Sequence, residues 1–479
     1  MNYIYGTFVP SESGKTFERR NPADTRDLVG EYADSRAEDV QKAVDAARDA
    51  LPAWRKLSPD ARAQFLFRAA DLLQARKDAV AAALTREEGK SLVEAGGETG
   101  RGVVLLRYYA GEGLRVGGDV IPSANPNTLF YTERVPLGVV GLITPWNFPI
   151  AIPLWKAAPA LIYGNTVVLK PSDLSPQTAQ MIAEVFHEAG LPPGVFNLVQ
   201  GGKTAGEALV NARGLNALSF TGSAPVGKTI ARACVENGVR YQLEMGGKNP
   251  VVVLEDAHLP QAVELTVQGA MRSAGEKCTA TSRAIVVESI ADEFTRALVA
   301  RVEQLKIGPG TDPSAYLGPV ITGDARDRVL GHIARAKAEG AETVAGGTIP
   351  DAPDLAHGHY VSPTVFDNVQ PEMAIAQDEV FGPVLALLRV PDFDTALETA
   401  NRVAYGLSAS VFTRDIGNAL RFAREIEAGM VRVNGETAGV EPQAPFGGMK
   451  GSSSFSREQG QAAKDFYTQL KTIAIDKAG

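Results

Sequence analysis

Cysteine is scarce in this sequence. Two cysteines, Cys234 and Cys278, occur among 479 residues, and the sequence has no CxxC pair or Cys/His cluster with the spacing of metal ligands. A disulfide framework and a zinc site are therefore not expected. We predict no bound metal and a reducing, cytoplasmic location.

Long apolar runs and excess positive charge are also missing. The longest apolar stretch, GVVGLITPWNFPIAIPLW, contains three prolines and Asn147, so we interpret it as a strand, a turn and the start of a helix rather than a membrane span. The N-terminus shows no secretory pattern. A net charge of -8 and a pI near 5.4 give no general attraction to phosphate backbones. We therefore expect neither a membrane nor a nucleic acid as partner.

The apolar pattern predicts an α/β protein. Between about 38 and 95, apolar residues recur every three or four positions, which predicts amphipathic helices. From residue 138, short runs such as GVVGLIT and NTVVLKP alternate with helical segments, which is typical of a parallel sheet. A second series, from SRAIVVES to MVRVNG, predicts another α/β unit after residue 247. The segment 118–137 predicts a hairpin, and the tail FYTQLKTIAI predicts a strand that could pair with it between subunits.

Cys278 is a candidate nucleophile. It stands among small and polar residues in SAGEKCTATS, whereas Cys234 lies in an apolar helical pattern. A nucleophilic thiol needs a base, and Glu244, in the apolar and glycine-rich YQLEMGGKNP, is a candidate because burial raises the pKa of a carboxyl group. Taken singly, each residue has an ordinary alternative, since Cys278 can be structural and Glu244 can cap a helix.

Three further motifs suggest a cofactor site. In TPWNFPI, the Asn147 amide could donate to an oxyanion or only close its own turn. In SFTGSAPVGKTIA, Gly222 and Ser223 separate a strand-like run from a helix and could face a pyrophosphate, although the full GxGxxG pattern is absent. In VVLKPSDLSP, Lys170 and Asp173 could reach ribose hydroxyls, or Asp173 could cap the next helix.

As a set, the motifs resemble the NAD(P)-dependent aldehyde dehydrogenase superfamily from about residue 5 to residue 475. TPWNFP, LKPSD, FTGSAPVG, EMGGKNP, GEKC and DEVFGPV occur in the family's order, followed by APFGGMKGS and REQG. The resemblance implies a Rossmann-like cofactor domain over 1–117 and 138–246, and a second α/β catalytic domain over 247–447. It also implies a small β oligomerisation (bridging) element over 118–137 and 448–479, and a homodimer or homotetramer.

The resemblance also implies a role for each matching residue. Cys278 would be the nucleophile, Glu244 the general base, and Asn147 the oxyanion donor. An aldehyde would become a carboxylic acid through a thiohemiacetal and a thioester on the cysteine. The residues expected to bind NAD or NADP are Thr144, Trp146, Lys170, Ser172, Asp173, Phe220, Gly222, Ser223, Met245, Glu379 and Phe381. Those expected to contact the substrate are Phe148, Ile152, Trp155, Lys277, Thr279 and Phe446.

The chain departs from the common family pattern at several positions. Asp173 is one methylene shorter than the usual Glu, so we predict that both NAD and NADP support turnover, with Lys170 and Ser172 near a 2′-phosphate. Glu276 stands where many members have Gln, and Met245 where Leu is common. GGMKGSSSFSREQG and GEKCTATSR are similar to bacterial α-ketoglutaric semialdehyde dehydrogenases, which favours an acidic semialdehyde as the substrate.

Other functions remain open at this point. The enzyme could oxidise general aliphatic or aromatic aldehydes. A CoA-acylating dehydrogenase generally lacks the base, so Glu244 argues against that activity. A cofactor-free thiol hydrolase would leave the Gly222–Ser223 turn and Glu379 without a use. A non-enzymatic binding protein on the same fold would typically have lost Cys278.

Overall fold

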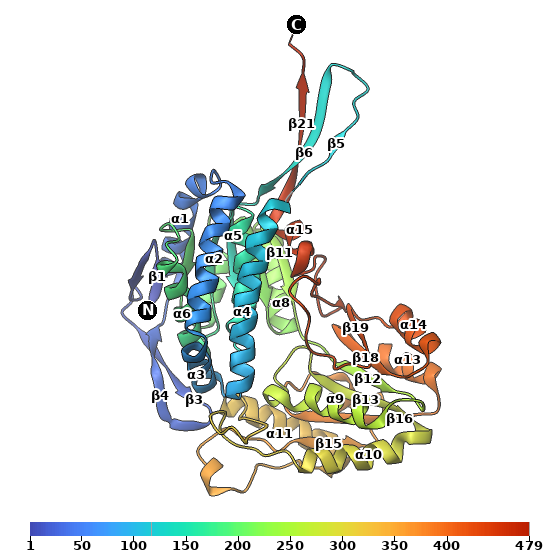
Figure 1. The fold of residues 1–479 in the computed structure, drawn as a ribbon. Coiled ribbons are helices and arrows are strands. Elements are labelled where there is room, and N and C mark those ends of the chain that lie inside the picture. The colour runs from blue at the N-terminus through green and yellow to red at the C-terminus, as the bar shows by residue number, and fades with distance from the viewer. Residues whose placement is uncertain (116, 479) are drawn as a thin grey trace.

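The computed structural model of the chain describes residues 1–115 and 117–478. Figure 1 shows two large α/β units, one at the upper left and one at the lower right, and a narrow sheet that projects from the upper unit. The C-terminus lies at the tip of this projection and the N-terminus lies beside the upper unit. The two seven-stranded sheets agree with the predicted α/β class and with the two predicted α/β layers.

The first sheet has the strand order β11-β10-β7-β8-β9-β1-β2. Strands β7, β8 and β10 are buried along their whole length, as expected for parallel strands with helices on both faces. The strands are β1 (Asn2–Ile4), β2 (Thr7–Val9), β7 (Val139–Ile143), β8 (Thr166–Lys170), β9 (Phe196–Leu198), β10 (Ala217–Thr221) and β11 (Arg240–Glu244). The helices of this unit are α1 (Ala37–Trp54), α2 (Pro59–Ala75), α3 (Lys77–Glu88), α4 (Leu92–Glu112), α5 (Ala151–Ile162), α6 (Pro176–Glu188), α7 (Lys203–Val210) and α8 (Ala224–Glu236).

The strand order reverses at β7. Strands β8 and β9 follow it on one side, and β10 and β11 lie on the other. All five run parallel. In open α/β sheets, ligands bind at such a switch point, outside the carboxyl ends of the strands. The loops after β7 and β10 are therefore the expected edges of a ligand site.

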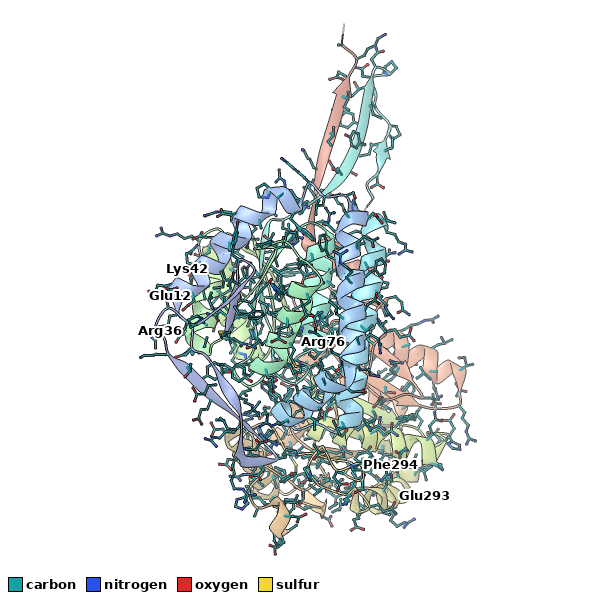
Figure 2. All side chains as sticks on the ribbon, turned by 60° about the vertical axis from the view of Figure 1, so that its left-hand side comes forward. Glu12, Arg36, Lys42, Arg76, Glu293 and Phe294 are labelled. Carbon is teal, nitrogen blue, oxygen red and sulfur yellow. The ribbon has the colours of Figure 1, made fainter. Side chains whose placement is uncertain are left out.

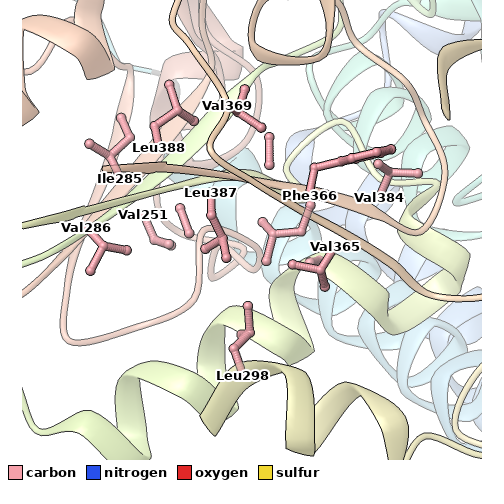
Figure 3. Packing of buried hydrophobic residues seen from close by; sticks show 14 of the residues in the cluster. Val251, Ile285, Val286, Leu298, Val365, Phe366, Val369, Val384, Leu387 and Leu388 are labelled. Carbon is pink, nitrogen blue, oxygen red and sulfur yellow. The ribbon is translucent and has the colours of Figure 1, made fainter. Parts of the chain in front are cut away.

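The second sheet has the order β14-β15-β16-β13-β12-β18-β19. Figure 3 shows its core, where Val251, Ile285, Phe366 and Leu387 of the strands pack with Leu298 of a covering helix. The strands are β12 (Asn249–Val253), β13 (Thr281–Val287), β14 (Glu342–Ala345), β15 (Thr364–Asp367), β16 (Val384–Val390), β18 (Ser408–Phe412) and β19 (Met430–Val433). The helices are α9 (Leu259–Met271), α10 (Glu288–Glu303), α11 (Gly323–Ala338), α12 (Ala374–Gln377), α13 (Phe393–Asn401) and α14 (Ile416–Glu425).

Helix α10 illustrates how the apolar period positions a helix. Figure 2 labels two adjacent residues of this helix, Glu293 and Phe294. Glu293 is exposed, whereas Phe294 is fully buried in the core of the second unit. The pattern of apolar residues thus fixes which face of the helix meets the sheet. Among the helices described, none is long and apolar enough to cross a bilayer.

The projecting sheet pairs β21 (Thr468–Asp476) with β6 (Thr128–Pro136), which also pairs with β5 (Val120–Ile121). The hairpin and the tail strand predicted from the sequence are therefore present. Leu129, Leu470 and Ile475 are about half exposed on this sheet, at 50%, 59% and 51%.

The predicted bridging element is too wide at the C-terminal side. Strand β20 (Met449–Lys450) pairs with β17 (Tyr405–Gly406) of the second unit, and Glu244 forms a bridge with Ser453. Helix α15 (Ala463–Tyr467) contacts α5. Residues 448–467 lie against the body because their backbone groups find partners there, and the three-stranded sheet includes the tail only from Thr468. The other domain boundaries stay predictions.

The N-terminal strands were not predicted. Strands β3 (Thr16–Asn21) and β4 (Asp24–Ala33) form a hairpin, and β1 and β2 extend the first sheet. Charged side chains interrupt the apolar alternation in β3 and β4, so the sequence carries only a weak strand signal there. The segment between these pairs is held to α1 by an exposed ion pair between Lys42 and Glu12 at 2.6 Å, both labelled in Figure 2.

Candidate active site

A cavity of about 410 Å³ joins the two large units. Its first edge is the loops after β7 and β10, as the switch point predicts. Its second edge is formed by loops that precede β13 and β16, together with α11. Eight of the predicted site residues line it, namely Trp146, Asn147, Gly222, Ser223, Met245, Cys278, Glu379 and Phe381.

Other lining residues were not predicted. Thr221, Pro225 and Gly246 are neighbours of predicted residues, so the motifs could have included them. Arg328 and Tyr405 carried no signal, because the first is one charge of an amphipathic helix and the second stands in no motif.

The loop before Cys278 has an unusual backbone. Ser273, Ala274 and Gly275 follow one another with φ of 53°, 50° and 69°. Left-handed conformations at non-glycine residues cost free energy and persist only where the surroundings fix them. Here the Glu94 carboxylate accepts hydrogen bonds from the Ser273 backbone N–H and hydroxyl, at 2.7 and 3.1 Å. The loop that presents Cys278 is therefore held from helix α4.

Cys278 is half-buried as a residue, and it packs against a small cluster of Leu407, Met430 and Phe446. Burial of the thiol, then the charges of Glu379 and Glu244, raise its pKa to about 12. The thiol is therefore protonated at neutral pH. Attack by the sulfur on a carbonyl carbon requires that a nearby base take its proton.

Glu244 ends strand β11 and is buried. Its Oε2 accepts a hydrogen bond from the Ser453 hydroxyl at 2.5 Å. Among the described residues its Oε1 has no partner. Burial, then the charge of Glu458, raise the pKa of Glu244 well above its ordinary value. A buried carboxylate with a free oxygen is suited to accept a proton from a thiol or a water.

A buried ion pair lies behind Glu244. Lys156 pairs with Glu458 and donates to the Ser219 hydroxyl at 2.7 Å. Trp155 Nε1 donates to the other oxygen of Glu458 at 2.7 Å. These contacts satisfy Glu458, and its negative charge is the second cause, after burial, of the raised pKa of Glu244.

Asn147 bridges the two halves of the site. Its Nδ2 donates to the Glu276 backbone carbonyl at 2.9 Å, so the amide points at the loop that carries Cys278. The backbone carbonyl of Asn147 accepts a hydrogen bond from Lys90 Nζ at 2.7 Å. Lys90 is paired in turn with Glu98 at 2.7 Å, and Glu98 accepts from the backbone N–H groups of 150 and 151. The side chain of Asn147 is therefore fixed in position to donate to an oxyanion.

Glu379 and Phe381 close the opposite end of the cavity. Glu379 Oε1 accepts from the Gly247 N–H at 3.0 Å, and burial raises its pKa to about 7. The Phe381 ring meets the Trp146 ring edge to face, with the centroids 5.6 Å apart. A Cβ on Gly246 would stand 2.0 Å from Glu379, so only glycine leaves room for this carboxylate.

A second cavity of about 550 Å³ continues the first, and Pro225 lines both. Lys170 lies in its wall with Ile143, Val226 and Ile230. Together the two cavities form an elongated, mostly apolar trough at the carboxyl edge of the first sheet. Such a trough fits a dinucleotide, and the buried Thr221 hydroxyl in its wall has no partner among the described residues.

Four predicted cofactor residues lie outside both cavity walls. Thr144 is buried. Phe220 is buried under Gly222, where an added Cβ would come within 2.5 Å of its ring. Ser172 Oγ faces Asp173 at 3.4 Å and accepts from the Leu174 N–H, and Asp173 is exposed.

None of the six predicted substrate contacts lines the cavity of Cys278. Ile152 is fully buried in the core of the first unit, because its face of α5 meets other helices. Lys277 does not line the cavity of Cys278, since its ammonium group donates to the Gln268 carbonyl at 3.4 Å. Trp155 and Phe446 face each other at 5.2 Å. The other two predicted contacts are Phe148, under the Lys90 ammonium group, and Thr279, which is buried.

The sequence profile of the aldehyde dehydrogenase family matches residues 8–473. The chain belongs to the aldehyde dehydrogenase family. Alpha-ketoglutaric semialdehyde dehydrogenase of Bacillus subtilis (strain 168) is 52% identical over 476 residues, which is 99% of this chain and 98% of that protein. Alpha-ketoglutarate semialdehyde dehydrogenase of Haloferax volcanii is 46% identical over 474 residues, or 98% of each chain.

Solved structures have the same fold. PnpE in complex with nicotinamide adenine dinucleotide has a TM-score of 0.97 at 36% identity, over 99% of this chain and 97% of that one. An NADP-dependent enzyme of E. coli has a TM-score of 0.96 at 34% identity, over 100% and 98%. The predicted family, fold class and enzyme class are thus confirmed. Within the described residues no group of three metal-ligating side chains occurs.

Proposed function

We propose that this aldehyde dehydrogenase oxidises α-ketoglutaric semialdehyde, or a closely similar acidic semialdehyde, to the dicarboxylic acid with NAD or NADP. Two relatives that bear this activity in their names match nearly the whole chain at 52% and 46% identity. The observation that carries the chemistry is the meeting of Cys278, Asn147 and Glu379 around one cavity, with Glu244 buried at its side.

The residues of the chain divide the chemistry between them. Glu244 takes the proton from Cys278, whose sulfur adds to the aldehyde carbon. The Asn147 side chain and the Cys278 backbone N–H stabilise the oxyanion, the kind of contact that typically contributes several kcal/mol. After oxidation of the adduct, Cys278 carries a thioester. Glu244 releases the first proton to solvent and then takes a proton from the water that attacks the thioester carbonyl, and the C–S bond breaks to free the acid and the Cys278 thiolate.

The trough at the first sheet would hold the coenzyme. When bound, the nicotinamide supplies the two-electron oxidation as a hydride acceptor. Glu379 and Phe381 would hold its nicotinamide ribose, Ser223 would face the pyrophosphate, and Lys170 would lie beside the adenosine; all four line the two cavities. Asp173 is exposed near Lys170, so a 2′-phosphate would meet no buried carboxylate, and we expect turnover with both coenzymes. Complete inactivity with either one contradicts this expectation.

The substrate proposal is tested with matched aldehydes. Glutaric semialdehyde and pentanal have the same length and differ in the terminal carboxylate, and α-ketoglutaric semialdehyde adds the keto group. We expect kcat/KM to be at least tenfold higher for the two acidic aldehydes, without any need for coenzyme A. Equal kcat/KM for glutaric semialdehyde and pentanal contradicts the proposal, and a requirement for coenzyme A indicates the acylating reaction instead.

We also propose that the enzyme is a homodimer or homotetramer in the cytoplasm. The half-exposed apolar residues of β6 and β21, Leu129, Leu470 and Ile475, support pairing of the projecting sheet with another subunit. Two unpaired cysteines support a reducing compartment. A monomer in sedimentation at micromolar concentration contradicts the first proposal, and cofractionation with the periplasm or medium contradicts the second.

A further inference from the structure

The proposed function implies an acidic semialdehyde as the substrate, and the inference about its binding site rests on that function. Such a substrate needs a cation some distance from the Cys278 nucleophile. The aldehyde carbon meets Cys278, so the carboxylate at the other end requires a positive partner or it remains desolvated and unpaired. Three buried lysines near the site already have partners. Lys277 donates to a backbone carbonyl, Lys156 is paired with Glu458, and Lys90 is paired with Glu98.

Arg101 is a further cation near the site. It lies on α4, one turn after Glu98, whose carboxylate accepts hydrogen bonds from the first backbone N–H groups of α5. Its neighbour Gly102 packs so tightly on α5 that an added Cβ would stand 2.8 Å from Leu154. Arg101 is therefore held against the start of the helix that carries Trp155. Its side chain is partly exposed, and within the described residues it forms no ion pair with a carboxylate.

Gln459 is the polar partner of Arg101. Arg101 Nη2 donates to Gln459 Oε1 at 2.8 Å. Gln459 is fully buried and has a left-handed backbone with φ 59°. Its Nε2 has no acceptor among the described residues. A buried amide donor without a partner destabilises the folded protein, and an incoming carboxylate oxygen would satisfy it.

These two residues lie next to the aromatic wall that begins at Cys278. Cys278 packs against the cluster that contains Phe446, and the Phe446 ring meets Trp155 at 5.2 Å. The backbone of Phe446 exchanges both hydrogen bonds with Glu458, at 2.6 and 2.8 Å, and Gln459 follows directly. A chain of contacts through Phe446, Trp155 and the Glu458–Gln459 segment therefore connects Cys278 to Arg101.

We propose that Arg101 and Gln459 form the subsite that binds the distal carboxylate of the semialdehyde. The guanidinium uses Nη2 on Gln459 and can offer its remaining N–H groups to the carboxylate oxygens, while Gln459 Nε2 donates to one of them. Burial lowers the pKa of Arg101, and the charge of Glu98 opposes that shift. An arginine remains protonated at neutral pH all the same. The pair is a specificity-determining site and takes no part in the bond-making steps.

The test compares Arg101→Met with the matched control Arg107→Met. Methionine keeps the apolar stem of Arg101 but removes its charge. Arg107 lies on the same helix and makes an exposed ion pair with Asp71, so its loss controls for a missing charge on α4. We expect kcat/KM for glutaric semialdehyde to fall about 10- to 100-fold in Arg101→Met. Pentanal oxidation, the KM for NAD and the hydride burst at saturating substrate should change less than about threefold.

Two conservative variants add a graded readout. Arg101→Lys retains the charge without the planar fork, so we expect an intermediate loss for the acidic aldehyde alone. Gln459→Glu places a carboxylate beside the site and should raise the KM for glutaric semialdehyde more than the KM for pentanal.

The results separate this inference from the proposed function. If the wild-type enzyme does not prefer glutaric semialdehyde to pentanal, the proposed function fails. If it does prefer it and Arg101→Met keeps that preference, the Arg101 subsite is wrong. An equal loss with both aldehydes in Arg101→Met and Arg101→Lys assigns Arg101 a structural role and also overturns the proposal.

Discussion

Replacing Glu244 by Gln tests the chemistry most directly. The amide has the same size, and its oxygen can still accept the hydrogen bond from the Ser453 hydroxyl. The amide nitrogen then takes the place of Oε1, which has no partner among the described residues. One buried donor is left unpaired, which costs about 1–3 kcal/mol of stability, so the variant should fold.

The two half-reactions should respond differently. Removal of a general base typically slows the step it serves by about 10²- to 10⁴-fold. If Glu244 chiefly activates the hydrolytic water, each active site should still reduce one coenzyme, and the thioester should then accumulate. Stopped-flow absorbance of the reduced coenzyme should show a burst followed by a slow steady state, while Cys278→Ala should abolish both phases.

The pH profile supplies an independent readout. Burial raises the pKa of Glu244 well above its ordinary value, and only the ionised carboxylate acts as a base. The steady-state rate of the wild type should therefore rise about tenfold per pH unit below that pKa and level off above it. In Glu244→Gln this rise should disappear.

Glu236→Gln, on the exposed end of α8, is the matched control and should leave burst, steady state and pH profile unchanged. An unchanged steady-state rate in Glu244→Gln would show that Glu244 is only structural. A missing burst with intact coenzyme binding would show that the same carboxylate is also required to form the thiolate.

Three further predictions concern the support of the site. Lys90→Met should destabilise the protein by about 3–5 kcal/mol in chemical denaturation, because Glu98 loses its buried partner. The double variant Lys90→Met with Glu98→Gln should recover part of this loss. A Lys90→Met protein as stable as the wild type contradicts this explanation. Gly275→Ala should lower activity at least 100-fold and lower Tm, because its Cβ would stand 2.1 Å from the Gly382 carbonyl oxygen at φ 69°; wild-type kinetics would refute this. Leu470→Asp should shift sedimentation toward monomer, whereas the exposed control Lys471→Asp should not.

The sequence predicted the two parallel sheets well, because buried strands are continuous apolar runs. The runs at 139–143, 166–170 and 217–221 are buried throughout and are flanked by turns and amphipathic helices. The N-terminal hairpin was missed, because its strands carry alternating charges and gain their partners only from the hairpin pairing itself.

The site was predictable only where the motif and the wall of the cavity coincide. Cys278, Asn147 and Glu379 lie in motifs, and all three line the cavity. Ile152 and Lys277 lie in or beside the same motifs, yet one faces the core and the other a backbone carbonyl. A motif fixes which residues are near one another along the chain, but the rotation of the helix or loop decides which of them the ligand can reach.

The sequence by itself determined the α/β class, the order of the strands along the chain and the residue types that the chemistry needs. The tertiary structure alone decided the environments of those residues. Glu244 becomes a strong base only because its neighbours remove water and place Glu458 close by. Arg101 and Gln459 stand 358 positions apart in the chain, and no local pattern links them. Burial and long-range contact are properties of the packed chain, and the pKa values and the carboxylate subsite follow from them.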